Sequence, residues 1–204
     1  MPKGHLFVIS APSGAGKTSL VRALMEYTDH LTTSTSYTTR PQRPGEENGK
    51  DYHFVDEQTF LSMRAANDFV ESAEVFGHFY GTSKSALTKE LDNGNDVILE
   101  IDWQGAEQVR NLFPDSTGLF ILPPSKTILL ERLKNRATDS AEVITRRTAE
   151  AITEMSHYAE FDYLVINDDF DIALLEAQSI ILSFRLKTAR QCETHKDLLN
   201  ELLE

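Results

Sequence analysis

The sequence has almost no cysteine and no long hydrophobic run. Cys192 is the only cysteine among 204 residues, so no disulfide can form within the chain. This scarcity is typical of proteins from a reducing compartment. No apolar stretch approaches the ~18 residues that span a bilayer, and the run at residues 6–9 is too short for the apolar core of a signal peptide. We therefore expect a cytoplasmic protein without membrane association.

Basic residues are also scarce. The chain carries 20 Lys and Arg against 32 Asp and Glu, a net charge of −12. The balance is uneven, because residues 1–50 hold 6 basic and 4 acidic side chains, whereas residues 139–178 hold 2 and 10. Such an acidic chain is a poor general binder of long nucleic acid or anionic membrane. An anionic ligand is expected near the N-terminal quarter, and the acidic stretch is expected to form a solvated helical face.

Hydrophobic periodicity predicts an α/β fold. Short buried strands alternate with helices, which is typical of a parallel sheet flanked by helices. Residues ~36–90 break this alternation, since they begin with a segment rich in Thr, Ser, Pro and Gly, and we interpret them as an insertion into one domain. We expect strands over residues 5–10, 96–101, 118–122 and 163–166, and helices over residues 17–27, 104–113, 126–136, 140–158 and 172–190.

A glycine-rich segment follows the first predicted strand and opens the first predicted helix. It fits the Walker A spacing of a phosphate-binding loop (P-loop), except that Ala11 stands where glycine is usual. Gly14 and Gly16 allow backbone N–H groups to approach phosphate oxygens. Lys17 supplies a positive charge and the Thr18 hydroxyl suits Mg²⁺. The predicted ATP-binding residues here are Ala11, Pro12, Ser13, Gly14, Ala15, Gly16, Lys17, Thr18 and Ser19.

A phosphate loop alone does not define the group that receives the phosphate. In the insertion, Arg40 and Arg43 lie three residues apart in a loop that also contains Pro41 and Pro44. Paired guanidinium groups suit bidentate binding of a second phosphate. The alternative is an ordinary surface salt bridge.

Several segments together resemble one family. They are the phosphate loop, the stretch SYTTRPQRPGE at residues 36–46, YGTS at 80–83, IDWQG at 101–105, PPS at 123–125 and VIND at 165–168. In this order, over residues ~5–190, they resemble the bacterial guanylate kinases. The resemblance implies transfer of the ATP γ-phosphate to GMP, and to dGMP, with Mg²⁺, giving ADP and GDP. It also implies a core (~1–35, ~94–135, ~160–204), an α+β GMP-binding insertion (~36–93) and a helical lid (~136–159).

The resemblance also implies roles for individual residues. A carboxylate only accepts hydrogen bonds, so Glu71 should favour guanine, which offers N–H donors, over adenine. Glu100 and Asp102 are candidates for holding Mg²⁺ through water. Implied catalytic residues are Lys17, Arg40, Arg136 and Arg147, and further ATP contacts are Arg132, Arg136 and Asn167. Implied GMP contacts are Ser36, Arg40, Arg43 and Tyr52 at the phosphate, and Glu71, Tyr80, Thr82 and Asp102 at the base.

Two other functions fit parts of this pattern. A non-enzymatic, guanylate-kinase-like peptide-binding module is disfavoured because Gly16, Lys17 and Thr18 are intact. A P-loop kinase for another phosphorylated small molecule would not need a pair of carboxylates such as Glu71 and Asp102. Oligomeric state stays open. Paired leucines in residues 197–204 suit a partner surface or packing on the same chain, of which we favour the second.

Overall fold

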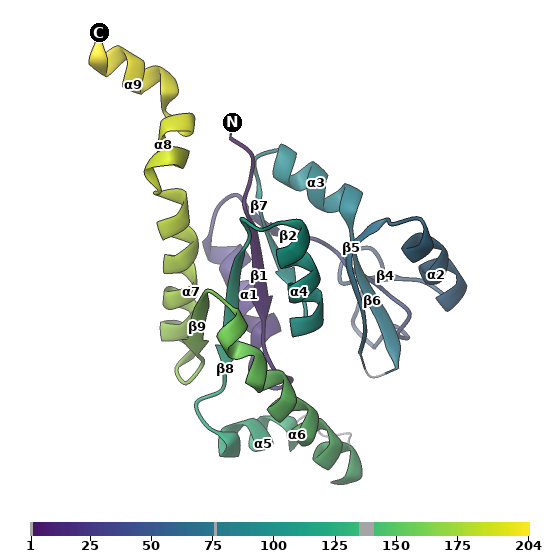
Figure 1. The fold of residues 1–204 in the computed structure, drawn as a ribbon. Helices are drawn as coiled ribbons and strands as arrows, with labels where there is room; N and C mark the ends of the chain where they lie inside the picture. Colours follow the sequence, from purple (N-terminus) through teal and green to yellow (C-terminus); the bar gives the residue numbers. More distant parts are fainter. Residues whose placement is uncertain (1, 76, 135–140) are drawn as a thin grey trace.

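The computed structural model of the protein describes residues 2–75, 77–134 and 141–204, and for residues 134 and 141–147 it describes the backbone alone. The predicted fold class is confirmed. A parallel sheet of five strands forms the core, and a mixed sheet of four strands lies beside it (Figure 1). Within the described ranges no helix is both long and apolar enough to cross a membrane.

The core sheet has the strand order β2-β7-β1-β8-β9, and all its pairings are parallel. β1 lies at the centre, and Ile9 near its end is paired with Glu100 at the end of β7. The loops that follow these two strands therefore emerge side by side at the carboxyl edge of the sheet. The strands are β1 (Leu6–Ser10), β2 (Leu31–Thr33), β7 (Asp96–Glu100), β8 (Thr117–Leu122) and β9 (Tyr163–Ile166). Sequence periodicity missed β2, because Leu31 is its only buried residue.

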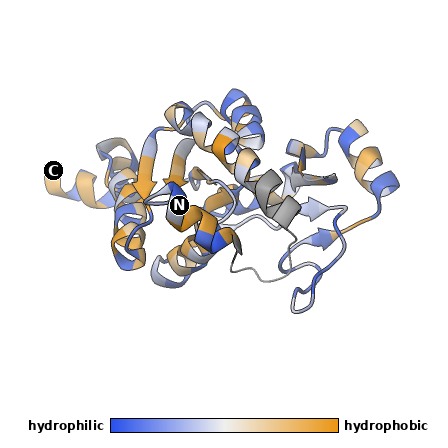
Figure 2. Cartoon of the chain, turned by 90° about the horizontal axis from the view of Figure 1, so that it is seen from below, coloured by the Kyte–Doolittle hydropathy of each residue, from blue (hydrophilic) through white to orange (hydrophobic). Residues whose placement is uncertain are grey.

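Helices cover both faces of the core sheet. α1 (Lys17–Tyr27) and α7 (Phe170–Arg185) share one apolar cluster with β1 and β8. α3 (Lys84–Asp92) and α4 (Trp103–Leu112) share a second cluster on the other face. A third cluster of Leu129, Leu133, Ala151 and Met155 joins α5 (Lys126–Lys134) to α6 (Ala141–Ser156), which continues into the 3-10 turn η1 (His157–Glu160). Hydrophobic residues gather in this core, whereas the loops of the second sheet are hydrophilic (Figure 2).

The second sheet has the order β4-β3-β6-β5 and carries α2 (Glu57–Ala65). Its small core is aromatic, because the fully buried Phe60 stacks on Phe69 and Phe79 at centroid distances of 4.7 and 5.5 Å. β5 is bound to the core by Gln108 of α4, which bonds both the N–H and the C=O of Ser72 at 3.0 Å. Its strands are β3 (Tyr37–Thr38), β4 (His53–Phe54), β5 (Phe69–Val75) and β6 (His78–Ser83).

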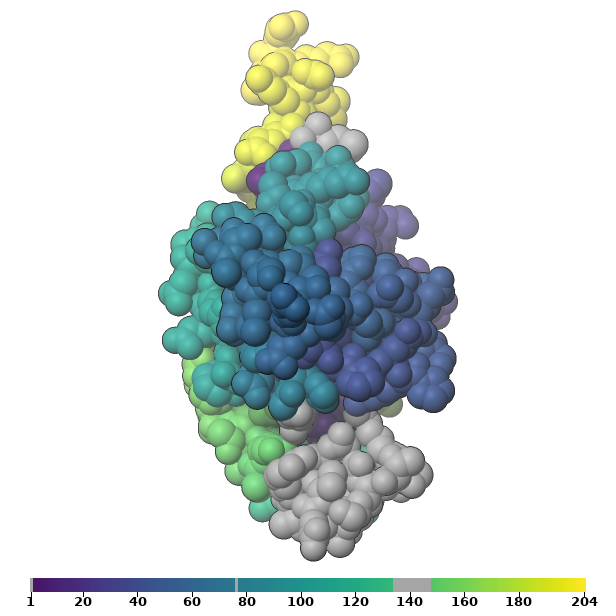
Figure 3. Space-filling view, turned by 90° about the vertical axis from the view of Figure 1, so that its right-hand side faces the viewer, coloured from purple at the N-terminus to yellow at the C-terminus, as the bar shows by residue number. Residues whose placement is uncertain are grey.

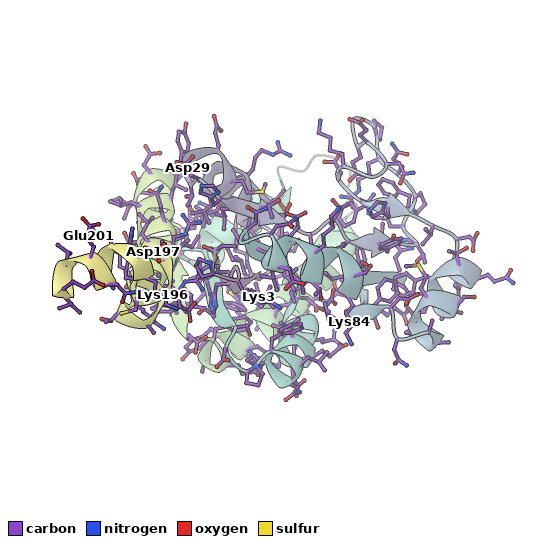
Figure 4. All side chains as sticks on the ribbon, turned by 90° about the horizontal axis from the view of Figure 1, so that it is seen from above. Lys3, Asp29, Lys84, Lys196, Asp197 and Glu201 are labelled. Carbon is purple, nitrogen blue, oxygen red and sulfur yellow. The ribbon has the colours of Figure 1, made fainter. Side chains whose placement is uncertain are left out.

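The C-terminal residues form an arm that projects from the body (Figure 3). The single helix predicted over residues 172–190 is wrong: α7 ends at Arg185, and α8 (Thr188–Thr194) and α9 (Lys196–Leu203) follow as separate helices. Packing of the terminal leucines on the same chain is also wrong, since Leu198, Leu202 and Leu203 are 49, 70 and 86% exposed. Lys196, Asp197 and Glu201 mark this end of the molecule in Figure 4.

Candidate active site

The phosphate loop connects β1 to α1 at the carboxyl edge of the core sheet (Figure 1). Gly14 and Gly16 have φ angles of 90° and 94°, a left-handed conformation that favours glycine. A Cβ atom at Gly16 would lie 2.4 Å from Nδ2 of Asn167, and one at Gly14 would lie 3.1 Å from Leu129 of α5. The loop therefore needs glycine at both positions, for its backbone conformation and for its close packing against neighbouring elements.

Asn167 follows β9 and lies against the loop, with only 4% of its surface exposed. Its side-chain Nδ2 donates to the main-chain carbonyl of Ala15 at 2.7 Å. Its main-chain carbonyl accepts a hydrogen bond from Nη2 of Arg132 at 3.2 Å. Nη1 of Arg132 is buried and has no hydrogen-bond partner among the described residues. A buried donor without a partner is costly, so this group suits a phosphate oxygen. Direct nucleotide contacts by both residues stay predictions.

Lys17 and Thr18 begin α1 and face the end of β7. Nζ of Lys17 donates to the carbonyl of Ile101 at 3.1 Å, and Oγ1 of Thr18 donates to Oε1 of Glu100 at 2.5 Å. The described residues contain no cluster of three or more His, Cys, Asp or Glu side chains that suits a metal. The site fits Mg²⁺ as this ion usually binds, through a few protein oxygens together with nucleotide phosphates and water.

A second group of residues lies where β5 and β6 of the inserted sheet meet α4. Glu71 pairs with Thr82 in the sheet register, and Oγ1 of Thr82 donates to Oε1 of Glu71 at 2.6 Å. The hydroxyl of Ser36 lies 3.4 Å from that of Thr82. On the facing side, Oδ1 of Asp102 accepts from the N–H of Gly105 at 2.9 Å and caps α4. One predicted base-binding carboxylate thus comes from β5 and the other from the start of α4, and the first turn of α4 lies against Glu71, since a Cβ atom at Gly105 would lie 2.8 Å from its Oε2.

Glu71 is unusual because it is a carboxylate only 4% exposed. Its pKa is raised from an ordinary value of 4.5 to about 7, mainly by burial and also by the nearby charge of Asp102, whereas the hydrogen bond from Thr82 and the charge of Lys17 oppose the rise. A buried acceptor with one oxygen bonded by Thr82 has capacity left for a ligand donor. The carboxylate therefore suits a ring that presents N–H groups.

Arg40, predicted at the acceptor phosphate, lies in the loop that follows β3. Its guanidinium is 9% exposed, bonds Oε1 of Glu46 at 2.7 Å, and lies 5.4 Å from the ring centroid of Tyr52. Burial raises the pKa of Tyr52 to about 12, so its phenol stays a hydrogen-bond donor at neutral pH. The Tyr80 ring lies 6.0 Å from that of Tyr52, and the Arg43 side chain is exposed. Arg40 and Tyr52, both predicted at the acceptor phosphate, thus lie close together, and Tyr80, predicted at the base, lies beside Tyr52.

The remaining predicted residues are placed as follows. Arg136 lies outside the described residues, as does the side chain of Arg147. Within the phosphate loop, Pro12 and Ala15 are buried. Thr18 and Ser19, at the start of α1, are exposed.

Sequence reasoning gave no role to Glu46 or Gly105. Glu46 accepts hydrogen bonds from Arg40 and from the backbone N–H of Arg43 at 2.7 Å, and the Arg40 bond holds the pKa of Glu46 below its ordinary range. A Cβ atom at Gly105 would lie 2.8 Å from Oε2 of Glu71. The sequence could have indicated this role for Glu46, because an acidic residue that follows two arginines in a short loop is a natural partner for them. The closeness of Gly105 to Glu71 is visible only in the folded chain.

Comparisons with known proteins agree with this geometry. The family profile described as guanylate kinase matches residues 3–183. The guanylate kinase of Alkalilimnicola ehrlichii is 56% identical over 200 residues, covering 96% of this chain and 98% of the relative. That of Methylobacillus flagellatus is 55% identical, covering 98% and 100%. The crystal structure of guanylate kinase from Anaplasma phagocytophilum superposes with a TM-score of 0.78 at 33% identity, covering 93% of this chain and 90% of that one. The chain belongs to the guanylate kinase family.

Proposed function

We propose that this protein transfers the γ-phosphate of ATP to GMP, giving ADP and GDP. The observation that carries the proposal is the buried carboxylate of Glu71 beside the first turn of α4, close enough to the phosphate loop for the charge of Lys17 to act on it. A phosphate loop alone fits many nucleotide-binding proteins. A buried acceptor close to that loop adds a reason to select guanine.

The base selectivity follows from hydrogen-bond chemistry. Guanine presents N1–H and N2–H₂ donors, and a carboxylate accepts from both. Adenine presents a bare acceptor at N1, which would face the oxygen of Glu71 without a proton between them. The ionised carboxylate therefore disfavours adenine, because this base would leave a buried polar group unpaired. Glu71 and Asp102 therefore account for GMP as acceptor, with Ser36 and Thr82 completing the polar wall.

The transfer needs no general base from the protein. The acceptor is a phosphate oxygen, already mostly dianionic at neutral pH because the second pKa of a phosphate monoester is about 6. Phosphoryl transfer then depends on alignment and on neutralising negative charge. Lys17 supplies charge at the donor phosphates and Arg40 at the acceptor phosphate. We propose that Arg132, Arg136 and Arg147 act on the same phosphates.

Mg²⁺ completes the donor side of this proposal. When bound, it neutralises charge on the phosphates during transfer. We propose that the Thr18 hydroxyl oxygen holds it. Oε1 of Glu100 accepts a hydrogen bond from this hydroxyl at 2.5 Å, which turns the hydroxyl lone pairs away from the carboxylate. We propose that Glu100 and Asp102 contact the ion through water.

The segments of the chain have separate roles in this proposal. Residues ~36–93 bind the acceptor, the core at ~1–35, ~94–135 and ~160–204 binds ATP, and residues ~136–159 form a lid. Glu71 belongs to the inserted sheet and Arg40 to the loop after its strand β3, whereas Asp102 belongs to the core. The acceptor therefore binds between two structural units, as small-molecule sites often do.

ADP formation, coupled to a spectroscopic readout, tests the proposal. The protein is mixed with Mg²⁺ and ATP, together with GMP, AMP, UMP or no acceptor. We expect turnover well above the blank with GMP and near the blank with AMP and UMP. A GMP rate equal to the blank would refute the proposal. Turnover with AMP or UMP instead would identify a kinase for another nucleotide, and no turnover with any acceptor is the outcome for a peptide-binding module.

A further inference from the structure

α6 reaches back to the phosphate loop through one carboxylate. Oε2 of Glu154 accepts a hydrogen bond from the backbone N–H of Ser13 at 3.0 Å, across 141 residues of chain. Ser13 lies in the first turn of the loop, where the chain leaves β1. Because the donor is the backbone N–H of Ser13, this hydrogen bond restrains the main chain of the phosphate loop directly.

The carboxylate is placed in a demanding environment. Burial raises the pKa of Glu154, and the charges of Asp102 and Glu150 act in the same direction. The N–H of Ser13 and the charge of Lys17 favour the ionised form. Placing an acid beside an anion-binding loop opposes phosphate binding on charge alone. Because the charge of Glu154 weakens phosphate binding, the residue needs a compensating role. Its hydrogen bond to the N–H of Ser13 indicates that this role is to hold the backbone of the loop in position.

Other contacts attach the same end of α6 to the catalytic edge of the sheet. The ring of His157, three residues after Glu154, stacks on Trp103 with centroids 3.6 Å apart and planes at 6°. Trp103 directly follows Asp102 and begins α4. Ala151 and Met155 of α6 pack with Leu129 and Leu133 of α5.

The α5 contacts continue to the loop. Leu129 and Leu133 also flank Gly14, since a Cβ atom there would meet them at 3.1 and 3.3 Å. The loop, α5 and the end of α6 are thus packed as one unit, and Glu154 supplies its hydrogen bond to the loop backbone.

We propose that Glu154 is a positioning residue for the phosphate loop. Its carboxylate holds the N–H of Ser13 and so sets the first turn, which lets the N–H groups that follow converge on the ATP phosphates. This role requires only an oxygen that accepts the hydrogen bond from Ser13, and it does not require the negative charge of the carboxylate. The proposal rests on ATP being the donor, as proposed above, and it concerns the ATP side alone.

Substitutions separate this role from a purely structural one. Glu154→Ala removes the acceptor, and we expect kcat/KM for ATP to fall by about 10-fold or more, the usual effect of losing a hydrogen bond to a charged group. KM for GMP should stay within about twofold, because the acceptor site lies elsewhere. Glu154→Gln keeps an oxygen that accepts from Ser13, and we expect it to stay within about threefold of the wild-type protein. Glu176→Ala is the matched control, since Glu176 is exposed on α7, and we expect it to match wild type.

The measurements are steady-state kinetics with each substrate varied, calorimetric ADP binding and thermal melting of every variant. Calorimetry reports on the loop even where activity is too low to measure, and melting identifies a variant that has unfolded.

The proposal would be overturned if kcat/KM for ATP of the Glu154→Ala variant stayed within twofold of the wild-type value. A Gln variant as impaired as Ala would overturn it too, as would an equal rise in KM for ATP and for GMP in a folded Ala variant. Tighter ADP binding by Glu154→Ala would also overturn it, because the carboxylate would then compete with phosphate and the loop would not need its hydrogen bond. Failure of the wild-type protein to use GMP would refute the proposed function, whereas normal ADP binding by Glu154→Ala would refute this inference.

Discussion

The raised pKa of Glu71 makes GMP binding depend on pH in a calculable way. This pKa is raised from 4.5 to about 7, with burial as the largest cause. That rise corresponds to about 3 kcal/mol by which the site disfavours the ionised form. Guanine donates hydrogen bonds and so requires the ionised carboxylate. If Glu71 binds guanine as proposed, we expect GMP to bind the deprotonated protein and to displace the proton wherever Glu71 is protonated.

The size of the effect follows from the titration of one group. About half of the Glu71 side chains are ionised at pH 7, about a tenth at pH 6 and nearly all at pH 8, given a pKa of about 7. GMP affinity is then expected to fall by about tenfold from pH 8 to pH 6, in proportion to the ionised fraction. At pH 7, binding should release about half a proton from this group.

Isothermal titration calorimetry with GMP from pH 6 to pH 8 measures both quantities, with buffers of different ionisation enthalpy to count the protons. Glu71→Gln is the control, because it keeps the phosphate contacts but has no proton to lose, so its pH dependence reports the titration of the GMP phosphate. The ratio of wild-type to variant affinity should rise with pH and level off above pH 7. A constant ratio across this range would refute the reasoning.

Three substitutions test other parts of the site. Lys17→Ala should lower kcat by more than tenfold and change GMP binding much less, because the charge of Lys17 acts mainly on the donor phosphates and only as a minor influence on Glu71; steady-state kinetics that show a smaller loss of kcat would contradict its role. Arg40→Ala should raise KM for GMP by tenfold or more, since a guanidinium that bonds phosphate is lost, and an unchanged GMP titration would exclude that contact. Gly105→Ala should raise KM for GMP by tenfold or more with KM for ATP unchanged, because the added methyl would lie 2.8 Å from Oε2 of Glu71; wild-type GMP kinetics in this variant would show that the carboxylate moves freely.

Local patterns in the sequence predicted the central features well. A β-branched apolar run, two glycines with Lys17, and an amphipathic helix are contiguous, so the β1–loop–α1 unit depends on short-range chemistry. The parallel sheet followed from the alternation of strands and helices. Roles of single residues on nucleotides came from family resemblance, and they remain predictions.

Features that depend on distant contacts were not predictable in this way. The bond from Ser13 to Glu154 joins residues 141 positions apart, and no periodicity marks it. β2 was missed because an edge strand with a single buried side chain has no strong pattern. The break after Arg185 was missed because residues 172–190 hold no Pro or Gly to signal it. There the Arg185 guanidinium bonds the buried carboxylate of Asp96 at 2.7 Å, a tertiary contact that ties the end of α7 to the sheet.

The division of the acceptor site between two sheets constrains how this protein can be altered. Glu71 comes from the inserted sheet, and Asp102 and Gly105 come from the core. Exchanging residues ~36–93 for the insertion of another nucleotide kinase would leave the core half of the guanine wall in place. Conversely, residues ~36–93 of this protein transferred onto the core of another nucleotide kinase would lack Asp102 and Gly105. On the proposed contacts, conversion to a different acceptor base, in the laboratory or over evolution, is expected to need coordinated changes in two segments far apart in the chain.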